Sequence, residues 1–436
     1  MDLARGSLFA GLYRISGMFF WMRLGILTAR YLSVDDRGVY VTSVAIVGAV
    51  ASVAASFASA SGYFVTKGGR PAAEVAANGM VLALVSGGAL LGICLVLWAV
   101  WPWADGHVPL LVGLALFPII ARNALGGVFL GTNQIWKYNF SIHGPGYVAV
   151  VLLLFWVFVL DQRTLEAALG TWIAAQYLSL ALLAGMGLGW WSWIFSHRPD
   201  FVLIKRIVAF GAVTGLAGFI SFFNYRIDLL LVAGIDGKDG AGVYSTAVQV
   251  AEGLWLFSTA ISIASYSAVG LLSREDASEL TTRSVRHTLL VVSILCVGVF
   301  VLAPFIVETL FGERYGGAAN SLRVLCLGTA LFAPVSLLSN YFTVQLGRPS
   351  ISLWLASLSC VINVIVSLLL IPQVGYVGGA WATTISYAAS ASIAVILFLR
   401  ISGAPFGDLW RIRGDDVASY FRLGRRILNG ELFRHA

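Results

Sequence analysis

The heptapeptide GVYVTSV, Gly38–Val44, returns 204 residues further along the chain as GVYSTAV, Gly242–Val248. Five of the seven positions are identical. In a chain with 47 glycines and a hydrophobic content of 59%, such a match also arises by chance. It indicates an internal repeat only if both copies occupy equivalent places in the architecture, and the hydropathy of the surrounding chain decides that question.

Charged residues make up only 11% of the 436 residues, whereas soluble domains carry about a quarter. Apolar runs of about 20 residues recur between short polar breaks, which is typical of membrane-spanning helices and not of the alternating strands of outer-membrane barrels. The sequence therefore predicts an all-α polytopic membrane protein with about twelve transmembrane helices. The predicted spans are residues 8–32, 39–64, 76–103, 108–130, 141–161, 165–190, 207–235, 241–271, 286–311, 317–346, 349–371 and 375–400.

The basic residues of the loops predict the orientation. They concentrate on the side of both termini, for example at Lys67 and Lys137, and few fall in the opposite loops, among them Arg37 and Lys238. By the positive-inside rule, we expect both termini to be cytoplasmic. The net charge of +7 then reflects membrane insertion and predicts no nucleic-acid partner. Residues 401–436 are predicted to be a basic cytoplasmic tail, either an amphipathic helix on the membrane surface or a poorly ordered segment.

The two heptapeptides occupy equivalent predicted places, because one begins the second span and the other begins the eighth. A weaker echo, P-x9-V-x-L-G, starts at Pro118 in the fourth span and at Pro334 in the tenth. An even number of spans in each half gives both halves one orientation and a pseudo-two-fold axis along the membrane normal. We therefore predict two pseudo-symmetric six-helix lobes, residues 1–200 with a cytoplasmic linker and residues 201–400, around a central cavity. This architecture is typical of transporters.

Ionisable side chains at membrane depth are the strongest functional signal, because burying them in lipid is costly. Arg23 lies 15 residues before Gly38, and Arg226 lies 16 residues before Gly242. The repeat therefore aligns the two arginines as pseudo-equivalent residues near the middle of the membrane.

Arg122, Asp228 and Glu252 also lie inside predicted spans. Guanidinium groups bind phosphate bidentately, so Arg23 and Arg226, with Arg122 as a third candidate, are predicted to bind a phosphate or diphosphate. The alternative is that the arginines pair with Asp228 or Glu252 and lock helices together. Either acid is equally a candidate for binding a coupling proton or Na⁺. The cysteines and histidines show no ligand spacing, so no metal or other cofactor is predicted.

Four segments resemble a known family. They are LTARYLSVDDRGVY, YRIDLLLVAGIDGKDGAGVYSTAV, FGERYGGAANSLRVLCLG and QLGRPSISLWLASLSCVINVIVSLLLIPQVGYVGGAWATTISY. The residues of the last segment that follow the family pattern are Asn363, Ile371, Pro372, Gly375, Gly378, Ala380, Ala382 and Thr383. Across nearly its whole length the chain resembles the polysaccharide flippases of the multidrug/oligosaccharidyl-lipid/polysaccharide exporter superfamily. These motif residues are expected to be structural, with Pro372 ending one helix and the glycines forming a tight turn.

The resemblance implies a secondary transporter that moves an undecaprenyl-diphosphate-linked oligosaccharide from the inner to the outer leaflet of a bacterial cytoplasmic membrane. It implies a diphosphate held by Arg23, Arg226 and Arg122, ion coupling at Asp228 or Glu252, and membrane lipids and polysaccharide polymerase machinery as partners. The alternatives are a drug exporter of the same superfamily, a lipid-linked peptidoglycan precursor flippase and, from another class, a membrane polysaccharide polymerase or ligase. The short outer loops argue against that last, enzymatic alternative.

Overall fold

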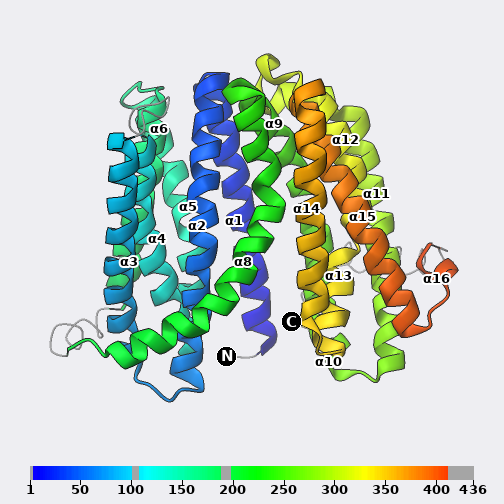
Figure 1. Cartoon of the computed structure of the whole chain (residues 1–436), viewed down its shortest axis with the longest axis horizontal. Coiled ribbons are helices and arrows are strands. Elements are labelled where there is room, and N and C mark those ends of the chain that lie inside the picture. Colours follow the sequence, from blue (N-terminus) through cyan, green and yellow to red (C-terminus); the bar gives the residue numbers. More distant parts are fainter. Residues whose placement is uncertain (1–2, 101–107, 188–197, 411–436) are drawn as a thin grey trace, which may run out of the picture. The chain divides into compact units, whose positions relative to one another are not determined.

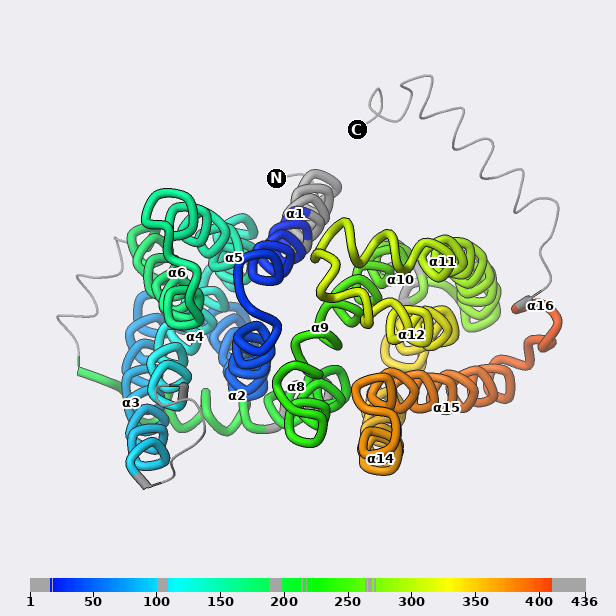
Figure 2. The backbone as a smooth tube through the Cα atoms, turned by 90° about the horizontal axis from the view of Figure 1, so that it is seen from above, coloured from blue at the N-terminus to red at the C-terminus, as the bar shows by residue number. Residues whose placement is uncertain are grey.

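The computed structural model describes residues 3–100, 108–187 and 198–410, and this part of the chain is built of helices without a strand. The predicted tail therefore lies outside the described residues beyond Trp410. In the first half the helices are α1 (Leu3–Tyr31), α2 (Val34–Thr66), α3 (Ala72–Val100), α4 (Val108–Gly131), α5 (Ile135–Phe158) and α6 (Leu165–Gly185) (Figure 1). Each corresponds to one predicted span. Figure 2 looks along these helices and shows α2 to α6 grouped side by side.

The second half contains two spans that are interrupted. Its elements are α8 (Phe201–Ile235), α9 (Gly237–Gly253), α10 (Trp255–Leu271), α11 (Arg274–Phe311), η1 (Glu313–Tyr315), α12 (Ala318–Phe332), α13 (Val335–Asn340), the π-helical η2 (Tyr341–Gln345), α14 (Pro349–Val374), α15 (Tyr376–Ser402) and α16 (Phe406–Trp410). The eighth predicted span breaks at Leu254 and the tenth breaks before Pro334, which lacks the backbone N–H that a continuous helix needs. Pro118, its predicted counterpart, stays inside α4.

The predicted fold class is confirmed. In the part of the chain that the structure describes, nine helices are long and apolar enough to cross a membrane, and α1, α8 and the α9–α10 pair occupy the three other predicted spans. The chain is a multi-pass membrane protein.

The contacts within the chain group the residues into two units, which are Gly6–Ser245, and Thr246–Ala436 together with Met1–Arg5. This division differs from the predicted lobes, because α8 and the start of α9 group with the first six helices. The reason is the fit of α8 against α2. A Cβ added to Gly211 or Gly215 would lie 3.0 or 3.1 Å from the hydroxyl oxygen of Ser56, so the glycines allow a close approach of the two helices. The lobe boundary that the repeat predicts, between residues 200 and 201, stays a prediction.

The two copies of the repeat meet inside the first unit, at the helix corners α1–α2 and α8–α9. A Cβ added to Gly38 would overlap the carbonyl oxygen of Lys238, and one added to Gly242 would overlap the carbonyl oxygen of Val34. Both contacts relate residues by the same 204-residue step, since Lys238 stands to Val34 as Gly242 stands to Gly38. The contact is therefore reciprocal, and the repeat is an architectural feature that chance does not explain.

The family-like segment of α14 and α15 is structural, as expected. Asn363 donates a hydrogen bond to Thr383 Oγ1 at 3.1 Å, and both side chains are buried. Pro372 does not end α14, because the helix continues past it to Val374. The turn is made instead by Gly375 at φ 61°, a conformation that glycine adopts without strain.

Replacing Asn363 by alanine should lower the stability of the purified protein by about 1–3 kcal/mol, because Thr383 Oγ1 and the hydroxyl of Ser367 lose their buried partner. Thermal unfolding in detergent measures the effect. Since Asn363 and Thr383 share one hydrogen bond, the double variant with Thr383→Val should cost less than the sum of the two single changes. Additive losses would show that the bond contributes nothing.

Candidate functional site

The first unit contains an open cavity of about 690 Å³. Its walls come from α1, α2, α4, α5 and α6, with Phe222 of α8 closing one side. Besides Val44 and Val47, the lining residues on α2 are small: Gly48, Ala51, Ser52, Ala55 and Ala58. The Gly- and Ala-rich run of α2 thus leaves space where larger side chains would fill the bundle. The volume is within the range of ligand pockets.

Arg122 brings a positive charge into this cavity. It lies on α4 and is 8% exposed, and within the described residues its Nε and Nη1 atoms have no hydrogen-bond partner. No Asp or Glu is among the described residues that line the cavity. A buried charge without a partner costs several kcal/mol, so Arg122 is suited to receive an anionic ligand. The sequence predicted Arg122 as the third of its candidate arginines, and the structure places it in the cavity wall.

Neutral polar groups surround the same space. Gln176 on α6 is 5% exposed and its Oε1 has no partner in the described chain, so it can accept a hydrogen bond from a ligand. Asn123 and Ser141 also line the cavity, and each donates to a backbone carbonyl of its own helix. His143 lines the wall too, although the sequence analysis singled out no histidine. Only the packing of α5 and α6 against α4 brings His143 and Gln176 together with Arg122.

The cavity wall includes neither Arg23 nor Arg226 among its described lining residues. Arg23 is exposed on α1, with its guanidinium 4.5 Å from the centre of the Phe19 ring. Arg226 is half-buried on α8, one helical turn beyond Phe222. The structure therefore does not gather the three predicted arginines in this cavity, and their binding of a diphosphate stays a prediction.

The pseudo-equivalence of Arg23 and Arg226 is wrong by one residue. Helices α1 and α8 end at Tyr31 and Ile235, which are related by the same 204-residue step as the glycine contacts. In this register Leu24 matches Asp228, and both are 4% exposed. A shift of one residue turns a side chain by about 100° around a helix, so the two arginines project in different directions.

Asp228 is hydrogen-bonded to Tyr244, a residue of the second repeat copy. Its Oδ2 accepts a hydrogen bond of 2.6 Å from the hydroxyl of Tyr244, and its Oδ1 accepts from the backbone N–H of Leu229 at 2.8 Å. Glu252 is half-buried near the end of α9 and belongs to the second unit. Ion coupling at either acid stays a prediction.

Arg37 is a residue whose place the sequence analysis missed. The predicted topology puts it in an outer loop, whereas the structure puts it in the first turn of α2 with 1% exposure. It donates hydrogen bonds to the carbonyl oxygen of Gly25, to Thr28 Oγ1 at 2.8 Å and to Ser245 Oγ at 3.2 Å. Arg37 therefore joins the two corners that carry the repeat, a role that no sequence pattern indicates.

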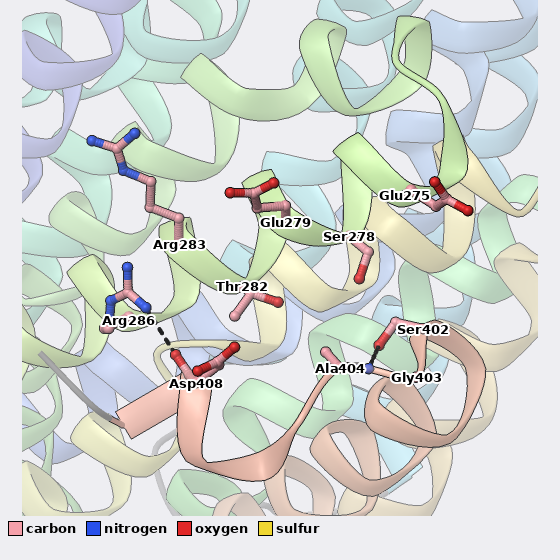
Figure 3. Close-up of a pocket in the computed structure, with 10 residues that line it drawn as sticks. All are labelled: Glu275, Ser278, Glu279, Thr282, Arg283, Arg286, Ser402, Gly403, Ala404 and Asp408. Atoms are coloured by element: carbon pink, nitrogen blue, oxygen red, sulfur yellow. Dashed lines mark hydrogen bonds between the residues drawn. The ribbon is translucent and has the colours of Figure 1, made fainter. Parts of the chain in front are cut away.

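A second cavity, of about 530 Å³, lies where α11 packs against the end of α15 and α16 (Figure 3). Its wall mixes both charge signs, with Glu279 and Asp408 next to Arg283 and Arg286. The Nη1 of Arg286 donates to the backbone oxygen of Asp408 at 3.0 Å. Because its charges oppose one another, this pocket indicates no single ligand class, and the cavity around Arg122 is the candidate site.

Solved structures with the same fold are transporters. The chain superimposes on an inward-facing multidrug resistance MATE family transporter of the MOP superfamily with a TM-score of 0.71 at 14% identity, covering 90% of this chain and 98% of that one. It superimposes on the lipid II flippase MurJ, in an inward closed conformation, with a TM-score of 0.73 at 14% identity, covering 92% and 89%. The chain has the fold of the multidrug/oligosaccharidyl-lipid/polysaccharide exporter superfamily.

Sequence comparisons show which members of this superfamily the chain is similar to. Residues 146–320 match the family model described as polysaccharide biosynthesis protein. The chain is 24% identical over 223 residues to the probable low-salt glycan biosynthesis flippase Agl15 of Haloferax volcanii, covering 49% of this chain and 47% of that protein. An uncharacterized membrane protein of Methanocaldococcus jannaschii is 28% identical over 181 residues, covering 40% and 41%. The chain spans about half the length of the curated relatives it matches. These matches confirm its resemblance to the polysaccharide flippases.

Proposed function

We propose that this protein is a flippase that moves a lipid-linked oligosaccharide across a cytoplasmic membrane by alternating access, with an undecaprenyl-diphosphate-linked repeat unit as the substrate. The observation that carries the proposal is Arg122, a buried guanidinium whose Nε and Nη1 have no partner among the described residues, in a cavity whose described lining residues include no Asp or Glu. The superfamily fold and the similarity to a glycan flippase support the same function. A flippase needs no catalytic residue and no resident cofactor, and its partners would be the lipid-linked substrate, the surrounding lipids and the polymerase machinery.

The drug exporter of the same superfamily is the second candidate. A cationic drug would need an acidic cavity, whereas the wall around Arg122 has no Asp or Glu among its described residues and favours an anionic substrate. A peptidoglycan precursor flippase would also take an anionic lipid, and the fold shared with MurJ keeps this alternative open. Both termini are proposed to be cytoplasmic on the evidence of the basic loops.

Deleting the gene should make cells accumulate a lipid-linked oligosaccharide that faces the cytoplasm and lose the finished polysaccharide from their surface. Mass spectrometry of lipid extracts and surface-glycan staining measure the two effects. The wild-type gene should reverse both, and Arg122→Gln should insert at normal levels but restore less than about a tenth of the surface polysaccharide, because an interaction with a buried charge is lost. Arg323→Gln is the matched control, since Arg323 is half-buried on α12 and is not among the described residues that line the cavity. Absence of the accumulated lipid would refute the proposed function.

A further inference from the structure

The cavity around Arg122 contains more than a positive charge. Four aromatic side chains line it: Trp21, Trp172, Tyr138 and Phe222. Four other side chains with neutral amide or hydroxyl groups lie in the same wall: Ser52, Asn123, Ser141 and Gln176. Aromatic rings provide flat apolar faces, and amides and hydroxyls both donate and accept hydrogen bonds. A pyranose ring has this combination of surfaces, with apolar C–H faces and a rim of hydroxyl groups.

The charge of the cavity suits a ligand with a single negative charge. Arg122 is the sole arginine among the described lining residues, no lysine is among them, and His143 is the other titratable base. A diphosphate carries two or more negative charges and is bound best by several cations or oriented N–H groups. The described lining residues include one arginine and no lysine, so the wall offers a diphosphate few cations. A carboxylate carries one charge and fits the planar guanidinium of one arginine.

We propose that this cavity is a subsite for an acidic sugar of the oligosaccharide, whose carboxylate pairs with Arg122. This inference rests on the proposed function, because the sugar is part of the lipid-linked substrate. Gln176 accepts a hydrogen bond from a sugar hydroxyl through Oε1, which has no partner in the described chain. Trp21 and Trp172 face the sugar ring. The diphosphate is bound outside this cavity, and Arg122, which the sequence assigned to the diphosphate, selects the saccharide.

Two disaccharides that differ in one group test the proposal on the purified full chain in detergent. Cellobiuronic acid carries a carboxylate where cellobiose carries a hydroxymethyl group. Microscale thermophoresis should show that the wild-type protein binds cellobiuronic acid at least about tenfold more tightly than cellobiose, because a buried guanidinium gains a charged partner. Equal affinities for the two disaccharides would overturn the proposal. So would pyrophosphate that binds more tightly than cellobiuronic acid and displaces it, because Arg122 would then belong to the diphosphate.

Variants assign the preference to residues. Arg122→Gln should lower the affinity for cellobiuronic acid to that for cellobiose, whereas Arg122→Lys should keep part of the difference because it keeps the charge. Gln176→Leu should weaken the binding of both disaccharides to a similar extent, because it removes a hydrogen-bond acceptor for a sugar hydroxyl. Arg323→Gln, on another helix, should leave both affinities unchanged. If Arg122→Gln fails to fold, the proposal is still tested by the affinities of the wild-type protein and of Arg122→Lys for the two disaccharides.

Different results would refute the proposed function and the proposed sugar subsite. If deletion strains do not accumulate cytoplasm-facing lipid-linked oligosaccharide, the flippase proposal fails whatever the disaccharides bind. If those strains accumulate it and Arg122→Gln retains the preference for cellobiuronic acid, the flippase proposal stands and the subsite is refuted.

Discussion

Replacing Gly38 by valine is expected to destabilise the protein by at least about 3 kcal/mol, seen as a fall of several degrees in the thermal unfolding midpoint in detergent. The added side chain would overlap the backbone oxygen of Lys238, and a backbone atom cannot move aside as the end of a flexible side chain can. Gly242→Val should have a similar effect, because Gly242 makes the reciprocal contact with Val34.

Gly88→Ala and Gly92→Ala on α3 are the matched controls. A Cβ at either position meets no atom within 4 Å, so these changes should be neutral or stabilising by up to about 1 kcal/mol. If Gly38→Val were no more harmful than the controls, the close contact between the two corners would not exist in the protein.

Arg37→Ala is expected to cost about 3–5 kcal/mol, because it removes three hydrogen bonds of a charged donor and leaves their acceptors buried. Ser245→Ala removes one of these bonds and should cost about 1 kcal/mol. Thermal unfolding and the yield of monodisperse protein measure both effects.

The control for Arg37 is Arg163→Ala. The side chain of Arg163 is 58% exposed and that of its partner Asp161 is 82% exposed, so the loss of this surface pair should stay within about 0.5 kcal/mol. A similar loss from Arg163→Ala and from Arg37→Ala would mean that the buried position of Arg37 contributes no stability.

The sequence predicted the helices well, because long apolar runs have few alternatives to spanning a membrane. It did not predict the break at Leu254 or the π-helical η2, since local deviations in a helix depend on its neighbours. It found Arg122 by its charge but ranked it below Arg23 and Arg226. The one-residue error in matching those two arginines was already present in the counts of 15 and 16 residues back from the two glycines, which were treated as equal.

The site could be predicted only in part. An arginine inside an apolar span is visible in any sequence, whereas Gln176 and His143 are ordinary members of their helices until folding places them in one wall. The small residues of α2 were visible as well, but small residues occur both where helices pack closely and where a helix lines a cavity. They therefore did not predict the cavity. Gly127 of α4 packs against the backbone of Ala58, and Ala58 also lines the cavity, so the same stretch serves both purposes.

The reciprocal contact of Gly38 and Gly242 has a consequence for the history of the chain. A patch that meets its own copy is the arrangement of a homodimer about a two-fold axis, in which every substitution appears on both sides of the interface at once. After gene duplication and fusion the copies can diverge, and a change then affects one side only. Leu24 and Asp228 illustrate such a difference, since both matched positions are buried and only one of them carries a carboxylate.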